Sequence, residues 1–388
     1  MFKQMIQFPQ QEDLEPIAGG IMGLHDHISP TNRQLALLSV CRNMRRFGVT
    51  AAKTREGRSL LGDKVGSSMI LGLSHYYKAD GTKKLICGAG DVWKVYNEGT
   101  NKWEDLKSGL TGGNPYNAVT FNNLHIITNG VDNVQRYDGT SITDLGGNPP
   151  KGRYISSAYQ RVAITGISDN PHWIRFSDIA NPEEWIDGDS ATIPVNDKDG
   201  DKITWAQLYK ANWIIWKRNS FFELHGPELG QTTEDWSIIS VAAVGTPNGR
   251  TIVDVNGMLY WLSDSDNARG VVRWSGGRPV IVSEPVENII KSINYAAIKT
   301  ACAVTSGEGE YILAIPTGDS EYPNTIIVYN VMDNSWWIWD GWQPTIFLPY
   351  RIGDTSTLLM GDNDGRVYAY GGSRDERPDE ELPEPEGD

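Results

Sequence analysis

The chain has 388 residues, of which 49 are acidic and 35 basic, so its formal net charge is −14. A surface of that sign repels phosphate, which argues against a protein that coats DNA. The 41 glycines and 14 tryptophans suit many turns that join short aromatic-rich strands. Three widely separated cysteines fit neither a disulfide framework nor a zinc site and are expected to be reduced thiols. No signal peptide or membrane span is expected, because no stretch approaches roughly 18 uninterrupted apolar residues.

Residues 1–66 differ in sequence pattern from the rest of the chain. This difference predicts an arm that lies over the body of the protein. The segment 29–38 is the most helix-like of the chain, with Ser29 as N-cap and Pro30 at the first helical position. Extended pieces between residues 41 and 61 follow. They carry the candidate partner-binding residues Arg42, Arg45, Arg46, Arg55 and Arg58. Such a group could grip phosphate, although arginines beside acidic turns more often form ion pairs.

From residue 68 onward a unit recurs along the chain. It consists of an apolar strand, a Gly or Asp turn, and a strand that ends in an aromatic residue followed by Asn, Asp, Ser or Gly. The spacing between copies, about 40–50 residues, is typical of propeller blades. The units fall near residues 68–106, 117–146, 153–187, 201–241, 248–283 and 296–340, with a partial unit at 344–372.

One short run, 212–216, indicates how the units are stacked. In an extended strand Trp213 and Ile215 lie on one face, while Ile214 and Trp216 lie on the other, because side chains alternate with period two. Both faces are apolar and must be covered, as they are when sheets stack around a ring. A core strand of a β-sandwich is the alternative that the repeats argue against.

The sequence therefore predicts an all-β fold, a β-propeller of about seven four-stranded blades, with six as the alternative count. The last unit has only three strands, and we expect a strand from the arm, near residues 50–61, to complete it and close the ring. A short helix is expected near 285–293, after the fifth blade. The domains are the arm (1–66), the propeller (67–372) and an acidic, proline-rich tail (373–388) that is expected to be disordered.

Motifs that carry catalysis or bind metals are missing or incomplete. The chain lacks a phosphate-binding P-loop, a G-x-S-x-G turn and an H-E-x-x-H helix. His25 and His27 show no third metal ligand. The acidic run 197–201 resembles a calcium loop, but Lys202 and Leu208 occupy the positions of the required glycine and final glutamate, so a surface turn is favoured.

The acidic run 361–365 likewise suits a hairpin turn. A propeller glycosidase would need paired carboxylates in its channel, and the sequence places no such pair. Nor does it match the repeated turn of sialidase blades. We therefore expect no enzyme activity, no cofactor and no metal ion.

The order of segments resembles that of the β-propeller structural proteins of tailed-bacteriophage virions, the tail hub, nozzle and packaged-DNA stabilisation group. In the arm the matching residues are Gly19-Gly20, the strand 37–43 and the turn 53–57, where Glu56 replaces a common proline. The matching segments of the body are 173–178, 181–185, 214–226, 244–248, 259–263 and 336–341. The ordered set, which spans most of residues 19–341, carries the resemblance.

The resemblance implies a virion protein of the phage tail, assembled in the bacterial cytoplasm as a homo-oligomeric ring around the DNA exit channel. Its partners would be an adaptor or portal-linked ring and other tail proteins. Double-stranded DNA would pass without sequence-specific binding, aided by the negative surface, and no membrane insertion is implied. The alternative is a receptor- or glycan-binding propeller, or more weakly a glycan-hydrolysing one, with exposed tryptophans at 336, 337, 339 and 342.

Overall fold

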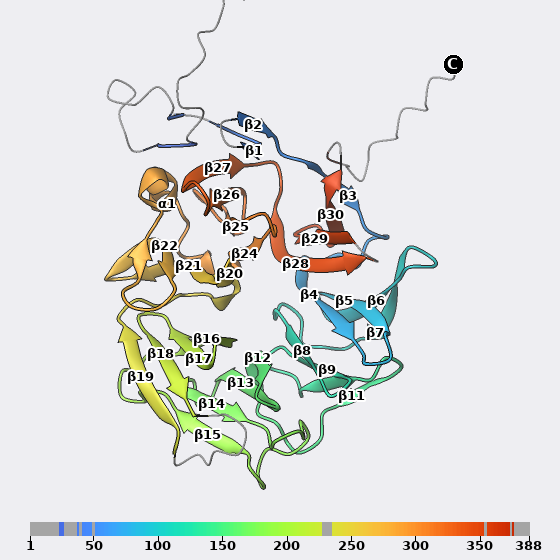
Figure 1. Ribbon diagram of the computed structural model, residues 1–388. Coiled ribbons are helices and arrows are strands. Elements are labelled where there is room, and N and C mark those ends of the chain that lie inside the picture. The colour runs from blue at the N-terminus through green and yellow to red at the C-terminus, as the bar shows by residue number, and fades with distance from the viewer. Residues whose placement is uncertain are drawn as a thin grey trace, which may run out of the picture.

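Seven four-stranded antiparallel sheets form a closed ring, and a separate two-stranded hairpin lies outside it (Figure 1). The computed structural model describes residues 23–26, 37–38, 41–48, 51–226, 235–352, 355–372 and 375. The predicted all-β fold with seven blades is confirmed, and the alternative count of six is wrong. Within each blade the strands follow one another from the centre outward in chain order, except in the last blade.

The first three blades occupy the chain up to residue 194. Blade 1 contains β4 (Ile70–Tyr77), β5 (Lys83–Ala89), β6 (Val92–Asn97) and β7 (Lys102–Lys107). Blade 2 contains β8 (Asn117–Phe121), β9 (Leu124–Thr128), β10 (Gln135–Tyr137) and β11 (Ile142–Asp144). Blade 3 contains β12 (Gly152–Ala158), β13 (Arg161–Ile167), β14 (Trp173–Phe176) and β15 (Ala191–Pro194).

The third blade extends past the predicted boundary at residue 187. Its fourth strand is β15, which pairs with β14 from Trp173↔Pro194 to Phe176↔Ala191. The apolar residue Trp185 belongs to the preceding loop, where its indole N–H donates to the carbonyl of Pro182 at 2.8 Å. The loop before β15 therefore resembles a strand in composition, because it contains a buried tryptophan.

Blades 4 to 6 follow in the same manner. Blade 4 contains β16 (Ile203–Tyr209), β17 (Asn212–Lys217), β18 (Phe221–His225) and β19 (Ser237–Ala242). Blade 5 contains β20 (Val253–Val255), β21 (Met258–Ser265), β22 (Ala268–Trp274) and β23 (Val280–Ile281). Blade 6 contains β24 (Cys302–Thr305), β25 (Glu310–Ile315), β26 (Thr325–Asn330) and β27 (Ser335–Trp339).

Short helices connect the fourth, fifth and sixth blades. They are the 3₁₀ turns η3 (Gly249–Thr251), η4 (Glu284–Val286) and η5 (Ile298–Thr300) and the helix α1 (Glu287–Lys291). The expected helix near 285–293 is thus confirmed. Among the residues that the structure describes, no helix is long and apolar enough to cross a membrane.

The seventh blade joins the two ends of the propeller. It contains β28 (Pro344–Ile352), β29 (Thr355–Asp362) and β30 (Val367–Gly372), and its outer strand is β3 (Gly57–Leu60) from the arm. Strand β3 runs antiparallel to β30, with Leu60 opposite Tyr368. Ring closure by an arm strand is therefore confirmed, and it ties the arm to the last blade of the propeller.

The cores lie between neighbouring blades. Trp213 packs against Phe176 of blade 3 with ring centroids 5.4 Å apart, and Trp216 packs against Trp261 of blade 5 at 5.9 Å. Residues 213–216 are all at most 1% exposed. Each buried indole removes about 200 Å² from water, worth roughly 5 kcal/mol before entropic costs. The two apolar faces of β17 thus bind blade 4 to both of its neighbours, as its alternation predicts.

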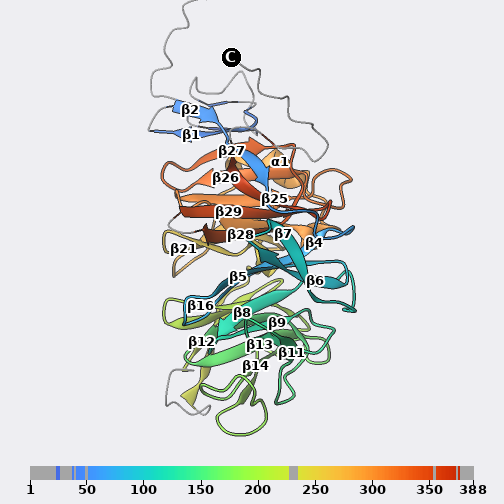
Figure 2. The same ribbon diagram turned by 90° about the vertical axis from the view of Figure 1, so that its right-hand side faces the viewer.

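The rest of the arm forms the hairpin β1 (Met44–Phe47) and β2 (Ala51–Thr54). With the disc seen edge-on, the hairpin lies at its rim next to β27 (Figure 2). The predicted helix at 29–38 falls largely outside the described residues; Leu38 forms a parallel β-bridge with Leu24. The predicted disordered tail, 373–388, also falls outside them, except for Asp375.

Candidate functional site at the N-terminal arm

Polar contacts fix the arm to the outer strand of blade 6. The N–H of Asn43 donates to the carbonyl of Ile338 at 2.7 Å, and its side-chain amide donates to Asp340 at 2.5 Å. In return, the indole N–H of Trp339 donates to the carbonyl of Met44 at 2.8 Å. Asn43 has a positive φ of 56°, a conformation that asparagine tolerates better than most residues. The arm is therefore anchored through its backbone as well as its side chains.

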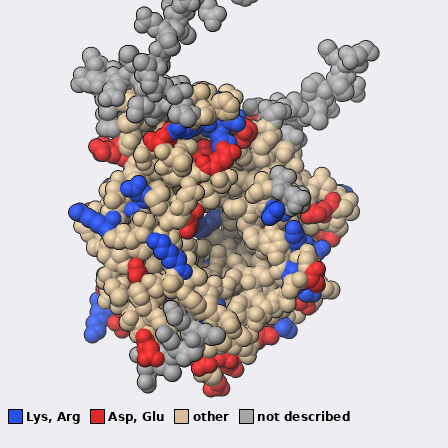
Figure 3. Space-filling model, in the orientation of Figure 1, with Lys and Arg blue, Asp and Glu red and all other residues tan. Residues whose placement is uncertain are grey.

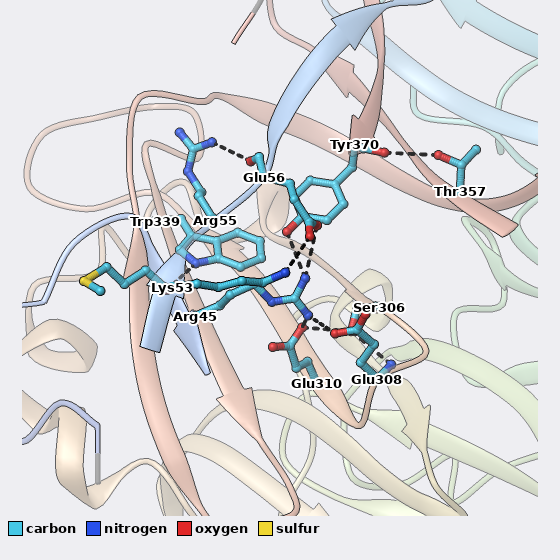
Figure 4. A network of polar contacts seen from close by, with 11 residues as sticks. Arg45, Lys53, Arg55, Glu56, Ser306, Glu308, Glu310, Trp339, Thr357 and Tyr370 are labelled. Carbon is cyan, nitrogen blue, oxygen red and sulfur yellow. Dashed lines mark hydrogen bonds and ion pairs between the residues drawn. The ribbon is translucent and has the colours of Figure 1, made fainter. Parts of the chain in front are cut away.

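Arg45 forms the centre of a network that joins the arm to blades 6 and 7 (Figure 4). Its guanidinium lies 2.9 Å from Glu310, 3.2 Å from Glu56 and 3.3 Å from the hydroxyl of Tyr370, and it also contacts Glu308. Arg45 is 2% exposed and Glu310 is 1% exposed. The ion pair of Arg45 and Glu310 is therefore almost completely shielded from water. In that environment each charge needs the other as its counter-ion.

The electrostatics of the network follow from burial and charge. Burial alone would lower the pKa of Arg45, but Glu310 and the other neighbours outweigh it and raise the pKa above its ordinary value. Burial raises the pKa of Glu310, and Arg45 offsets only part of that effect. Burial also opposes ionisation of Glu56, yet a hydrogen bond from Lys53 and the charge of Arg45 lower its pKa. Glu56 is thus the more readily ionised of the two carboxyl groups.

The other four arginines of the candidate group also form ion pairs. The pairs are Arg42 with Asp340 at 2.5 Å, Arg46 with Asp333, Arg55 with Asp375 at 3.0 Å, and Arg58 with Asp362 at 2.6 Å. Only Arg42 among the five has a side chain more than half exposed, at 63%. The group therefore closes the arm onto the propeller, while its contact with a partner stays a prediction, with Arg42 as the accessible member.

Aromatic side chains support two of these arginines. The guanidinium of Arg55 lies 3.7 Å from the ring centroid of Trp342, and that of Arg58 lies 3.9 Å from the ring centroid of Tyr368. Cation–π contacts at such short distances suit the planar guanidinium of arginine, which lysine does not reproduce. Burial raises the pKa of Asp362, the partner of Arg58, and the arginine counteracts it.

The acceptors of the arginines were missed by sequence reasoning. Outside the arm they are the carboxylates Glu308, Glu310, Asp333, Asp340, Asp362 and Asp375. Most stand in or beside turns, as many of the 49 acidic residues do. The one available signal was the position of Asp340 directly after an aromatic strand.

The tryptophans proposed for glycan contact are not exposed, which corrects that part of the alternative function. Trp336, Trp337, Trp339 and Trp342 are between 0% and 2% exposed. Trp339 stacks on Tyr370 at a centroid distance of 5.8 Å, between blades 6 and 7. These indoles belong to the cores between blades.

The two acidic runs are turns, as predicted. In the run 197–201 Asp199 pairs at 2.7 Å with the fully buried Lys217, and Asp201 accepts the N–H of Asn219 at 2.9 Å. The run 361–365 connects β29 to β30. Within the described part of the chain, no group of three His, Cys, Asp or Glu residues is placed to hold a metal ion. His25 belongs to no such group, and His27 lies outside the described residues.

A cavity of about 1080 Å³ lies at the centre of the ring. It is lined by residues of the innermost strand or the adjoining turn of every blade. The space-filling view shows the hollow from the face of the disc (Figure 3). Sequence reasoning assigned no binding role to its residues, because its lining is assembled from separate parts of the chain that span all seven blades.

Comparisons with known proteins bear only on the fold. The chain matches no family model, and no curated protein matches it. Among solved structures it is similar to the extracellular domain of BT4673, a hybrid two component system of B. thetaiotaomicron, with a TM-score of 0.57 and 7% identity over 81% of this chain and 40% of that one. This likeness, together with the ring of blades, defines the class: the chain is a seven-bladed β-propeller protein.

Two further structures show weaker similarity. The computationally designed Ika8 protein has a TM-score of 0.48 and 12% identity, over 81% of this chain and all of that chain. The WD40 domain of Neurospora crassa Pan2 also has a TM-score of 0.48, with 9% identity over 84% of this chain and 96% of that one.

Proposed function

We propose that this protein is a structural component of a tailed-phage virion. It forms part of the tail hub, nozzle or head-to-tail closure, where several copies surround the DNA exit channel, hold packaged DNA and allow its ejection. The observation that carries the proposal is the structural role of the arm in closing the ring. The same segment that opens the phage-like order of motifs supplies β3 to the ring and lays the hairpin on the rim.

A mechanical role without catalysis suits the architecture. The described blades share continuous apolar cores with their neighbours, and blades 7 and 1 meet in the cluster that contains Ile70 and Leu359. A closed ring of this kind resists shear, because displacing one blade would expose apolar surface on two sides. Rigid discs are suitable units for symmetric rings.

DNA would pass between copies of the protein and not through one propeller. The central cavity of about 1080 Å³ has the size of a small-molecule site. One turn of duplex DNA is about 34 Å long and needs far more space. The net charge of −14 would limit adhesion of phosphate to a channel formed by several discs.

The hairpin is the part of the arm that we assign to the partner. Phe47 is 59% exposed at the end of β1, where the Lys53 ammonium lies 5.6 Å from its ring centroid, and Arg42, before the start of β1, has a largely exposed side chain. Aromatic residues and arginine are both enriched at protein interfaces. The adaptor or portal-linked ring is the partner proposed for this surface.

The mass of the purified protein in solution, alone and mixed with its adaptor, tests the proposal. A defined oligomer, alone or induced by the adaptor, is expected. Phe47→Asp should weaken the assembly at least about tenfold, whereas Ile186→Asp, at a 68% exposed position in blade 3, should not. Cryo-microscopy of virions that located the chain in fibres, or failed to find it, would contradict the proposal.

The alternative function, a glycan receptor, depended on exposed tryptophans at 336, 337, 339 and 342. Their indoles are buried. A glycan array with the purified protein tests it directly. Saturable binding of a host envelope glycan would favour that function over the mechanical one.

A further inference from the structure

The lining of the central cavity differs in charge from the whole protein. It contains the cations Arg153, Arg250 and Lys299 and a single carboxylate, Glu321, so three positive charges and one negative charge give a net charge of +2. The chain as a whole carries −14. Basic residues are visible inside the hollow in the space-filling view (Figure 3). Positive charge is thus concentrated in a concave site of a negative protein, which favours the entry of anions.

One buried asparagine fixes the two turns that present Arg250 and Lys299. The side chain of Asn248 accepts the N–H of Arg250 at 3.0 Å and donates to the carbonyls of Lys299 at 2.9 Å and Ala301 at 2.7 Å. Asn248 is 5% exposed. Turns η3 and η5 are therefore held in a fixed relation, so both cations are attached to a rigid wall.

Arg250 lacks an acidic counterpart. Its guanidinium donates to the carbonyl of Thr345, and no carboxylate of the described residues forms an ion pair with it. Burial lowers the pKa of Arg250, while nearby Cys302 and Tyr154 act in the opposite direction. A partly buried cation without a counter-ion costs free energy that a bound anion would recover.

Aromatic side chains adjoin this cation. Tyr154 packs on Trp205 with ring centroids 5.3 Å apart, and both line the cavity. Burial raises the pKa of Tyr154, and the charges of Arg153 and Arg250 lower it in part, so its hydroxyl stays a neutral donor near both guanidinium groups. The cavity thus offers two aromatic rings, tilted by 60° to each other, next to fixed positive charge.

We propose that the central cavity binds a small organic anion. Its carboxylate or phosphate group pairs with Arg250, with Arg153 and Lys299 lining the same cavity, and its apolar part contacts Tyr154 and Trp205. The cavity volume of about 1080 Å³ is sufficient for such a molecule. This site does not depend on the virion role, and either can fail without the other.

Calorimetric titration of the full chain at low salt tests the site. Phenyl phosphate is the phosphate probe, benzoate is the carboxylate probe, and phenol is the neutral control of similar shape. At least one anion should bind saturably and more tightly than phenol. Arg250→Gln should weaken that binding by about tenfold or more, as expected for a hydrogen-bonded ion pair. Arg278→Gln removes the same charge at an exposed position between β22 and β23 and should leave the affinity unchanged.

Absence of saturable binding by both anions would overturn the proposal, as would equal weakening by the Arg250 and Arg278 variants. If Arg250→Gln fails to fold, Arg153→Gln replaces it, because Arg153 is exposed to the cavity and can be changed without disturbing the core. A severalfold loss of affinity is then expected. An Arg153 variant that binds as the unmodified protein does would refute the site.

Discussion

At the residue scale, the buried pair of Arg45 and Glu310 is the contact on which the arm most depends. Both side chains are withdrawn from water, at 3% and 1% exposure. A pair of this kind contributes little beyond a well-packed apolar pair, but loss of one partner leaves a buried charge unpaired. The network of Figure 4 is therefore sensitive to single substitutions.

Arg45→Met should lower the free energy of unfolding by about 3 kcal/mol or more, because Glu310 is left buried without its counter-ion. Urea unfolding, monitored by tryptophan fluorescence, measures this change in the free energy of unfolding. Arg42→Met is the matched control: the Arg42 side chain is 63% exposed, and its pair should contribute about 1 kcal/mol or less. Equal effects of the two substitutions would contradict the assigned role of Arg45.

Asp340 gives the arm a dependence on pH. Burial opposes its ionisation, but hydrogen bonds from Arg42 and Asn43 lower its pKa below the ordinary value. A lowered folded-state pKa contributes stability above the unfolded value, and that stability is lost as the pH falls through the folded value. Unfolding curves from neutral pH to about pH 3 should show Asp340→Asn less stable at neutral pH, with a shallower fall in acid. An unchanged slope would disprove the contribution.

At the scale of elements, β3 is the most consequential strand, because it lies more than 300 residues from its partner β30 in sequence yet completes the same sheet. Its Arg58 pairs at 2.6 Å with Asp362, whose side chain is 6% exposed. Loss of β3 would therefore leave an open sheet edge and a buried carboxylate without its partner.

Two truncated chains separate the hairpin from the closing strand. A chain that begins at Gly57 keeps β3 and lacks the hairpin β1–β2, whereas one that begins at Gly62 lacks both. The second should be less stable than the first by roughly 3 kcal/mol or more, since Asp362 loses Arg58 and the sheet loses its outer strand. Denaturant midpoints compare the two chains. Coinciding midpoints would show that β3 does not close the ring.

At the scale of the whole molecule, the ring encloses its thiols. Cys41, Cys87 and Cys302 are free and at most 5% exposed. Burial raises the pKa of each thiol, that of Cys302 to about 12, so little reactive thiolate forms at neutral pH. Their protection is a property of the intact ring, because they lie in different blades and at the arm.

A thiol-specific chromogenic reagent should label none of the three cysteines in the native protein at neutral pH and all three after unfolding. Any slow labelling under native conditions should proceed no faster than global unfolding, because only the unfolded chain exposes the thiols. Rapid labelling of any native cysteine would indicate that a blade opens locally.

The sequence by itself determined the class of fold and most of the blade boundaries. Alternation in 213–216 predicted burial on both faces, and the repeated unit predicted the seven blades, because both signals reside in neighbouring residues. The missing strand of the last unit even indicated that the arm would complete it. These features follow from local periodicity, which a single chain displays directly.

Tertiary structure alone decided the contents of the candidate sites. Arg45 meets Glu310 across 265 residues of sequence, Trp185 turned out to be buried by a loop, and the tryptophans from 336 to 342 proved inaccessible. The cations of the central cavity likewise come from separate blades. The physical reason is that ring closure brings side chains far apart in sequence into one low-dielectric environment. No local sequence pattern encodes which of these side chains meet.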